Sequence, residues 1–494
     1  MNRCLYAPKV LFIGLLTCQL LATLHVHLSN VALYIDLQRL RDAGYLIIPN
    51  QKVMESLPKA APALLGGLFF TLSVGAGLTL LTLAAVWIWD RLLHRKKIFT
   101  LLGLLPWLGL VFAANHRGFA PMVTAYFLII PVVVFAVALK WLPAPSGKRI
   151  WPIRLAYSLP ILLLAGLWIS QMDARLFTGI RDNLLLSNRF GLKINDFYYK
   201  YTLYPAQVFK SLDQKTLKTC SLENLEKRPA ALVENALLDN DYLRVTGGPP
   251  VDLKIVKQED RLIFQRQGKT ILTTSLKDFL SKPQSELKAF SSLTDRYGFF
   301  RQFTFLSLLI GFPITLYVLF FGLFCLPLCV FLSSRVSSVI ASMLCLISGV
   351  ALFGVFSQGA AERIQVDALP DAMTSARRQT RVAALATLCE ERMDIGDFQA
   401  YKKMLSSSHI AERYWLARAL GASRRTDTYD DLMLLLNDPH PNVVCMVFYS
   451  LGERGDRSAI PQILERTAAS DHWYEQWYAY RALRKLGWKQ KNLK

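Results

Sequence analysis

The sequence lacks the residue patterns that mark most enzymes. Its 494 residues contain no Walker loop and no GxSxG or HExxH motif, and no GxGxxG stands between a strand and a helix. Histidine is scarce, with 7 in the whole chain. We therefore predict no catalytic residue and no cofactor, and we do not expect the protein to be an enzyme.

The sequence also lacks a CxxC pair. Four of its 8 cysteines (Cys18, Cys325, Cys329 and Cys345) fall within apolar runs, where a thiol behaves as a small hydrophobic group. The others are too scattered for a disulfide framework. We predict no metal site.

Charge is almost absent from seven long apolar runs. Four of these runs lie between residues 63 and 170, one covers 10–28, and two cover 303–332 and 336–356. A helix of about 20 apolar residues is long enough to cross a bilayer, so the pattern predicts about seven spans. The first run has no clear small-x-small cleavage site, which favours an uncleaved span over a signal peptide. In the second run, Gly66, Gly67, Gly75 and Gly77 would permit close contact between helices.

The net charge of +21 is concentrated beside these runs. The membrane part has 17 basic and 4 acidic residues, whereas residues 171–300 have 20 and 15, and residues 358–494 have 20 and 17. Basic residues beside spans set orientation and meet anionic lipid headgroups. We therefore expect membrane lipids as partners and no nucleic acid.

Residues 90–97 carry the strongest orientation signal, with Arg91, Arg95, Lys96 and Lys97. Short loops rich in Lys and Arg stay in the cytoplasm, so this loop and the N-terminus are predicted to be cytoplasmic. Five spans then place residues 171–300 on the opposite face, and seven place the C-terminus there too. The expected location is a bacterial inner membrane, with the soluble domains on the periplasmic face.

Composition divides the chain into segments of different character. The predicted fold is a multi-span α-helical membrane protein with a small α+β domain and a C-terminal α-solenoid. Four short strands of the α+β domain, at 242–245, 251–256, 261–266 and 270–275, are expected to be antiparallel. The predicted segments are a first span (1–30), an amphipathic interfacial connection (31–62), a four-span block (63–170), the α+β domain (171–300), two spans (301–357), a linker (358–374) and the solenoid (375–494).

The C-terminal part repeats itself. Leucines that close helical patterns recur at spacings of 32, 31 and 35 residues, which is the range for two-helix solenoid units. The clearest unit, residues 438–464, opens with Asp-Pro-His-Pro and turns at Gly-Asp. The recurring positions are Leu388, Leu420-Gly421, Leu451-Gly452 and Leu486-Gly487.

This pattern resembles the HEAT repeat, in the short bacterial form that is also found in phycobilisome lyases. The resemblance begins near residue 376 and implies an α-solenoid that binds proteins. It implies no lyase activity, because no chromophore-handling residues can be matched.

Two groups of residues are candidate binding surfaces. Trp473, Tyr474, Trp477 and Tyr478 in the last unit are a candidate protein-binding surface, although the alternative of burial in the capping helix is more common. His116 and Arg117 form a polar turn between two spans and are a candidate contact for lipid headgroups, or else an ordinary turn.

These observations favour a membrane scaffold that presents protein-binding modules at the cell envelope. The alternative is a membrane component that moves or modifies a lipid or glycan. Pro106, Pro131, Pro160 and Pro313 lie within spans and would break helices in such a protein. The central turns of the spans hold essentially no charged residue, which favours the scaffold.

Overall fold

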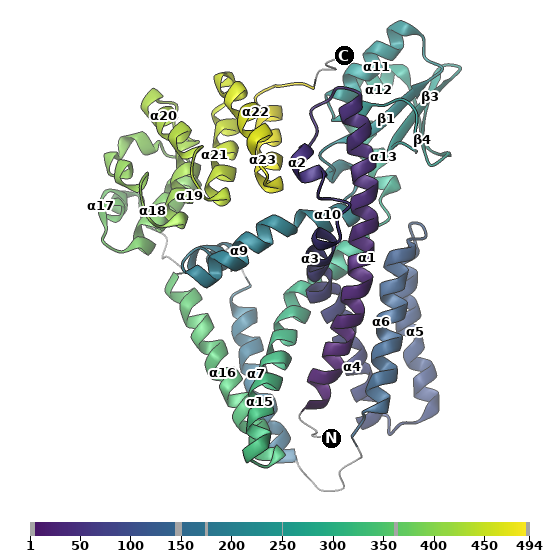
Figure 1. The fold of residues 1–494 in the computed structure, drawn as a ribbon, viewed down its shortest axis with the longest axis vertical. Helices are drawn as coiled ribbons and strands as arrows, with labels where there is room; N and C mark the ends of the chain where they lie inside the picture. Colours follow the sequence, from purple (N-terminus) through teal and green to yellow (C-terminus); the bar gives the residue numbers. More distant parts are fainter. Residues whose placement is uncertain (1–4, 144–150, 173–175, 249, 360–363, 491–494) are drawn as a thin grey trace.

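The computed structural model describes residues 5–143, 151–172, 176–248, 250–359 and 364–490. A long helical body carries two modules at one end, a small sheet domain and a curved row of helices (Figure 1). The N-terminus lies at the opposite end of the body. We call these parts the body, the sheet domain and the repeat domain.

The body consists of apolar helices that run along the long axis of the molecule (Figure 1). Five are long and apolar enough to cross a membrane: Tyr6–Asp42, Ala60–Arg91, Pro121–Lys140, Gly298–Phe331 and Ser334–Val355. Two shorter apolar helices, Gly103–Asn115 and Leu159–Ser170, coincide with the other two predicted spans. The body elements are α1 (Tyr6–Asp42), α3 (Ala60–Phe70), α4 (Ala76–Arg91), α5 (Lys97–Asn115), α6 (Pro121–Lys140), α7 (Trp151–Ser170), α14 (Gly298–Leu306), α15 (Phe312–Phe331) and α16 (Ser334–Gly359).

Two helices of the body contain a π-helical turn. The turn Thr71–Gly75 joins α3 to α4, and Ser307–Gly311 joins α14 to α15. Here the two helices approach each other closely, because a Cβ added to Gly77 would lie 2.1 Å from the Ser307 Oγ. A Cβ on Gly75 would lie 2.6 Å from that of Cys18 on α1. The glycines therefore permit close helix contact, as predicted.

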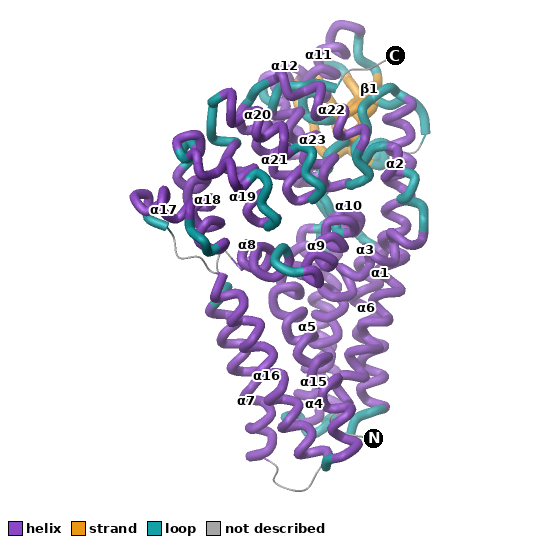
Figure 2. Tube along the Cα trace, turned by 60° about the vertical axis from the view of Figure 1, so that its left-hand side comes forward, coloured by secondary structure: helices purple, strands orange, loops and turns teal. Residues whose placement is uncertain are grey.

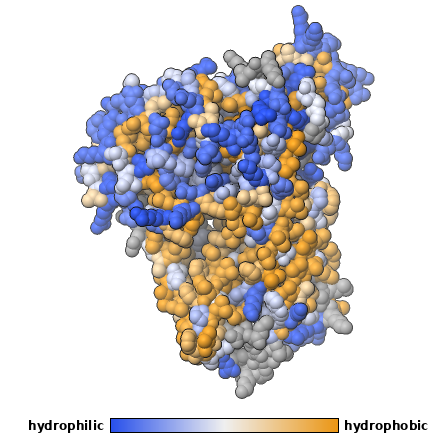
Figure 3. Space-filling model, in the orientation of Figure 1, coloured by the Kyte–Doolittle hydropathy of each residue, from blue (hydrophilic) through white to orange (hydrophobic). Residues whose placement is uncertain are grey.

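The body exposes apolar side chains over most of the face seen in Figure 3. Phe112 on α5 is 73% exposed, Leu162 on α7 is 64% exposed and Phe331 on α15 is 85% exposed. Monomeric proteins in water rarely expose so large a contiguous apolar surface.

The first helix differs from the prediction. The predicted boundary at residue 30, between the first span and the amphipathic connection, falls inside a helix, because α1 continues unbroken from Tyr6 to Asp42. No glycine or proline interrupts residues 15–43. Beyond residue 30, Leu37 and Leu40 are buried, and Arg39 donates to the carbonyl of Gly247 at 2.6 Å. The end of α1 therefore packs against the sheet domain.

The predicted four-span block is also divided. Helices α4, α5 and α6 pack on one another, and α4 and α6 also pack on α1, but α7 packs on α16. Gly349 on α16 makes room for Leu164 on α7, since a Cβ there would lie 2.4 Å from the leucine side chain. The chain order therefore does not decide which helices are neighbours.

The sheet domain contains five strands in the order β2-β1-β3-β4-β5. The prediction of an antiparallel sheet holds for β3, β4 and β5. It is wrong for β2, which pairs in parallel with β1, a strand that was not predicted and that is also parallel to β3. The missed strand β1 belongs to a β-α-β unit, and its sequence, KTCSLE, contains no β-branched alternation. The elements are β1 (Lys218–Glu223), α11 (Lys227–Leu238), β2 (Tyr242–Arg244), β3 (Leu253–Gln258), β4 (Arg261–Arg266), β5 (Lys269–Ser275), α12 (Leu276–Ser281) and α13 (Pro283–Thr294).

The repeat domain is a stack of helices in two rows. Helices α18, α19, α21 and α23 pack each on the next and form one row, and α20 and α22 lie outside it (Figure 2). The bounds are α17 (Leu369–Thr374), α18 (Arg378–Glu391), α19 (Ile410–Leu420), α20 (Thr426–Leu435), α21 (Pro441–Arg454), α22 (Ile460–Ala469) and α23 (Trp473–Lys485).

Equivalent arginines tie successive units together. Arg381 donates to the carbonyl of Ser375 at 2.6 Å and to the carboxylate of Glu412 in the next unit. Arg413, 32 residues later, donates to the carbonyl of Ser407 and, at 2.6 Å, to Asp438 in the following unit. The repeat is therefore visible in its polar contacts as well as in its leucines.

A candidate binding cleft between the repeats and the sheet domain

The repeat domain is fixed to the rest of the chain by buried polar contacts. The indole N–H of Trp415 donates to Asp182 at 2.7 Å, and the amide of Asn195 donates to Asn442 at 2.9 Å. Both Asn195 and Asn442 are fully buried. Buried polar groups that are paired in this way require one relative placement of their elements.

The loop after α1 makes a second set of contacts. The side-chain amide of Asn50 donates to the carbonyls of Thr467 at 3.0 Å and Ser470 at 2.8 Å, and its backbone N–H donates to Gln476 at 2.8 Å. Asn50 also caps the short helix α2 (Gln51–Met54). This loop therefore holds the last repeat beside α1.

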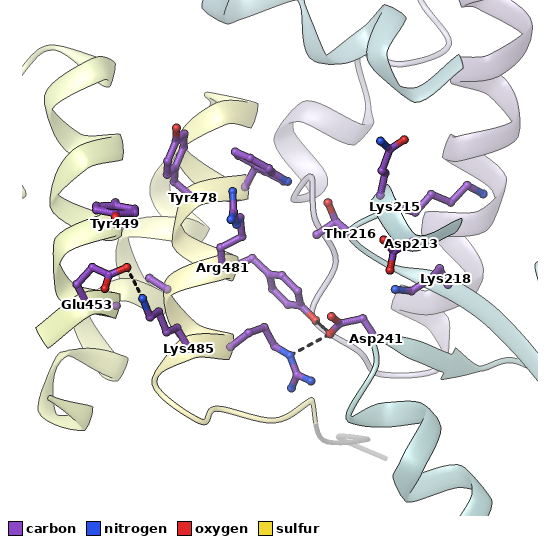
Figure 4. A pocket seen from close by; sticks show the side chains of 16 residues that line it. Asp213, Lys215, Thr216, Lys218, Asp241, Tyr449, Glu453, Tyr478, Arg481 and Lys485 are labelled. Atoms are coloured by element: carbon purple, nitrogen blue, oxygen red, sulfur yellow. Dashed lines mark hydrogen bonds and ion pairs between the residues drawn. The ribbon is translucent and has the colours of Figure 1, made fainter. Parts of the chain in front are cut away.

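A cavity of about 520 Å³ opens between the repeat domain and the sheet domain (Figure 4). One wall comes from α21 and α23, with Tyr449, Tyr478 and Arg481. The opposite wall comes from the start of β1 and the residues before it, with Lys215 and Lys218. This volume lies within the range of small-molecule and peptide sites. We call it the cleft.

Three ion pairs border the cleft. Arg484 contacts Asp241 at 3.0 Å, and the hydroxyl of Tyr480 donates to the same carboxylate at 2.5 Å. Lys485 pairs with Glu453 across α21 and α23. On the other wall Lys215 pairs with Asp252 at 2.7 Å. These six charges are satisfied within the chain.

Two further cations of the cleft have no such partner. Lys218 is 7% exposed, and within the described part of the chain its ammonium makes no hydrogen bond or ion pair. It lies 4.8 Å from the centre of the Tyr242 ring. Burial lowers the pKa of Lys218, against the attraction of Asp241 and Asp213. Arg481 is exposed and lies over the Trp477 ring at 4.7 Å. An anion in the cleft would therefore meet two available donors.

A smaller cavity of about 110 Å³ adjoins the cleft and shares Lys215 and Thr216 with it. Asp36 and Asp252 also line it. Its volume is below that of a typical ligand site and suits a few water molecules. We therefore regard the larger cleft as the candidate site.

The structure separates the four predicted aromatic residues into two pairs. Trp473 is 4% exposed and packs against Tyr204 at 5.0 Å, and Tyr474 packs against Tyr199 at 4.8 Å. Their partners belong to the same chain, so the prediction of a partner-facing surface is wrong for Trp473. Trp477 and Tyr478 are half-buried and line the cleft.

His116 and Arg117 lie in the turn after α5 and are exposed. The Nδ1 of His116 is 2.8 Å from the carbonyl of Ala113, and Asn115 accepts from the N–H of Ala120 at 3.0 Å. The turn is thus braced by its own residues, and a role in headgroup binding stays a prediction.

Sequence reasoning missed Lys218, Arg481 and Asp241. Lys218 begins the strand that was not predicted, so nothing in the sequence placed it opposite the repeats. Arg481 was detectable, because it follows Tyr449 by 32 residues and Arg418 by 63, which is one and two repeat lengths.

Among the described residues, no group of three or more His, Cys, Asp or Glu is arranged to hold a metal ion.

Comparison with known proteins bears on the C-terminal part. The family model for HEAT repeats matches residues 399–484, which include three of the four inner helices of the repeat domain. No curated protein and no solved structure gives a significant match. The resemblance predicted from the leucine spacing is thereby confirmed. The C-terminal region of this chain is a HEAT-repeat region.

Proposed function

We propose that the protein is an integral membrane interaction protein. The body fixes it in the bilayer, and the repeat domain and the sheet domain together bind a partner protein at the membrane surface. The observation that carries this proposal is the cleft, because its two walls come from the two modules and one wall consists of HEAT-repeat helices.

The surface of the body supports the membrane location. Its helices turn large apolar side chains outward, as at Leu162 and Phe331, and bury small residues where they cross, as at Gly77. Spanning helices favour this arrangement, because lipid solvates the outer face while small residues allow close packing.

The contact between the two modules supports their location on one side. Two candidate spans, Gly298–Phe331 and Ser334–Val355, lie between the sheet domain and the repeat domain. An even number of crossings returns the chain to the same side of a bilayer. Arg91 and Arg95, at the end of α4, flank Asp90 at the other end of the body, beside the start of α1. The positive-inside rule then assigns that end to the cytoplasm and the modules to the periplasmic side.

Helix α9 (Arg189–Tyr201) supports the position of the membrane surface. It lies across the end of the body, beneath the repeat domain (Figures 1 and 2). Phe190 is 74% exposed, and Ile194 and Phe197 share its face at 44% and 39%. The opposite face bears Asn195, which is buried against Asn442. A helix with one apolar face and neighbouring lysines suits the boundary between headgroups and acyl chains.

Topology reporters test this proposal. One reporter is inserted in the exposed β3–β4 turn at Glu259-Asp260, and one is fused after residue 494. Both are expected to report the non-cytoplasmic side, and alkaline carbonate is not expected to release the protein from membranes. Reporters on opposite sides, or release by carbonate, would contradict the proposal.

Partner binding needs a separate measurement. A photo-crosslinking amino acid at Tyr449, which is 41% exposed in the cleft, is compared with one at Leu232, which is 54% exposed on α11. We expect protein adducts in native membranes from Tyr449 and none from Leu232. Equal yields of protein adducts from both positions would contradict the assignment of the cleft as the binding site.

A further inference from the structure

The repeat wall of the cleft continues along the solenoid as a row of equivalent positions. Arg418, Tyr449 and Arg481 follow one another at 31 and 32 residues, on α19, α21 and α23. The guanidinium of Arg418 lies over the Trp415 ring at 5.1 Å and over the Tyr449 ring at 5.9 Å. The three side chains therefore form a continuous row, with an aromatic ring between two arginines.

All three side chains of this row are exposed, and Tyr449 and Arg481 line the cleft. Neither arginine has an ion-pair partner among the described residues. A guanidinium stacked on an aromatic ring keeps its N–H groups free for a carboxylate, which it binds in a bidentate manner. The row thus offers two anion-binding positions separated by an apolar ring.

The spacing of the row selects an extended ligand. Packed helices lie about 8–10 Å apart, so the backbones that carry Arg418 and Arg481, two helices apart, are separated by roughly 16–20 Å. An extended peptide rises about 3.3 Å per residue. About five to six residues of such a peptide reach from one arginine to the other. A single phosphate or lipid headgroup is too short to contact both.

The opposite wall adds a third cation. Lys218, with its unpaired ammonium, faces the cleft from the sheet domain. The same cleft also holds the carboxylates of Asp213, Asp241 and Glu453. These would repel a nucleic acid, which carries a charge at every phosphate, but they tolerate a peptide with few, separated carboxylates.

From this arrangement we infer that the cleft binds an extended acidic segment of the partner protein. One carboxylate lies between Arg481 and Lys218, a second lies about six residues away at Arg418, and an apolar residue between them contacts Tyr449. The inference rests on the proposed function and specifies the chemistry of the partner.

Binding of a designed peptide tests the inference. The full chain is purified in detergent and titrated with a fluorescent 12-residue peptide that has two Glu-Glu pairs six residues apart and one Leu between them. The matched control peptide has Gln in place of Glu. We expect the Glu peptide to bind about tenfold more tightly than the Gln peptide, and we expect its affinity to fall as salt is raised.

Three substitutions locate the site. We expect the affinity for the Glu peptide to fall by about tenfold in each of three variants, Arg481→Gln, Arg418→Gln and Lys218→Met. Lys269→Gln, at an exposed lysine that begins β5 outside the cleft, serves as the matched loss of one charge and is expected to leave the affinity unchanged. Circular dichroism of each variant establishes that it is folded.

The outcomes separate this inference from the proposed function. Equal affinity for the Glu and Gln peptides would overturn the inference that the ligand is acidic. So would a loss of affinity in Lys269→Gln as large as that in the three cleft variants. Displacement of the peptide by soluble short-chain phosphatidylglycerol at the same affinity would overturn it in favour of a lipid headgroup. If the crosslinker at Tyr449 still captures a protein in either case, the scaffold function stands and only the ligand chemistry fails.

Discussion

The body and the repeat domain are both built from helices, yet they place their leucines in opposite ways. In the repeat domain Leu416 is fully buried, and arginines and acids occupy the surface. In the body Leu162 is 64% exposed, while Gly77 lies at a helix crossing. Burial of apolar area stabilises the repeat domain, and close packing of small residues holds the body together. The repeat domain thus has the polar surface of a protein folded in water, whereas the body has the apolar surface that we propose to lie in a bilayer.

Truncating one leucine in each region gives the largest expected contrast. Leu416→Ala removes a fully buried side chain and leaves a cavity, so we expect it to lower the free energy of unfolding by about 2–5 kcal/mol. Leu162→Ala on the body removes only an outward-facing side chain, and we expect little change in detergent. Thermal unfolding of both variants in one detergent measures the difference. Equal losses would mean that both regions are stabilised in the same way.

Adding a methyl group tests the packing of the body. Gly77→Ala places a Cβ 2.1 Å from the Ser307 Oγ, and we expect it to cost about 1–3 kcal/mol. Gly109→Ala is the matched control, because nothing lies within 4 Å of a Cβ at that position. Chemical unfolding in detergent compares the two, and an unaffected Gly77→Ala would contradict the close crossing.

Acid is expected to loosen the repeat domain from α9. Burial lowers the pKa of His472 from 6.5 to about 4, and the charged groups that face it are Asp471, Asp196, Lys200 and His440. Between these two pKa values the unfolded state binds more protons than the folded state, so stability is complete above pH 6.5 and decreases toward pH 4. We expect about 1–2 kcal/mol to be lost at pH 5.

His472→Gln tests the source of this loss. Glutamine does not titrate, so the melting temperature of this variant is expected to fall less between pH 7 and pH 5 than that of the unchanged protein. An identical fall in the two proteins would assign the pH dependence to other groups.

The last prediction concerns the position of α9, which lies between the two regions. A spin label at Phe190→Cys is expected to be accessible to oxygen in the bilayer, because this side chain is 74% exposed on the apolar face. A label at Leu232→Cys on α11 is expected to be accessible to a water-soluble nickel reagent instead. Reversal of the two accessibilities would contradict the proposed position of α9 at the membrane surface.

Local patterns explain which elements were predictable. The apolar runs, the strands β3, β4 and β5 and the leucine spacing of the repeats each depend on neighbouring residues, so the sequence reveals them. The continuation of α1 past residue 30 was not predicted. Its charged residues indicated an interfacial helix, but Leu37 and Leu40 pack on a module that is formed far along the chain. The parallel strand β1 was missed because its own residues show no strand pattern, and it is a strand only through its pairing with β2 and β3 on either side.

The cleft could not be predicted for the same reason. Arg481 repeats an earlier position and was open to inference, whereas Lys218 lies about 260 residues before it in a strand without a clear pattern. Their juxtaposition depends on contacts such as Trp415 with Asp182 and Asn195 with Asn442, which join segments more than 230 residues apart.

The sequence by itself determined that this chain has long uncharged helices, a strand-rich insertion and a C-terminal HEAT-repeat region, because periodicity and composition act over short distances. Only the tertiary structure decided that the repeats dock on the sheet domain, that Trp473 is buried and that Lys218 and Arg481, which have no ion-pair partner among the described residues, line one cleft from opposite walls. Such contacts depend on the matching of surfaces that are distant in the chain, and no local pattern records which surfaces meet.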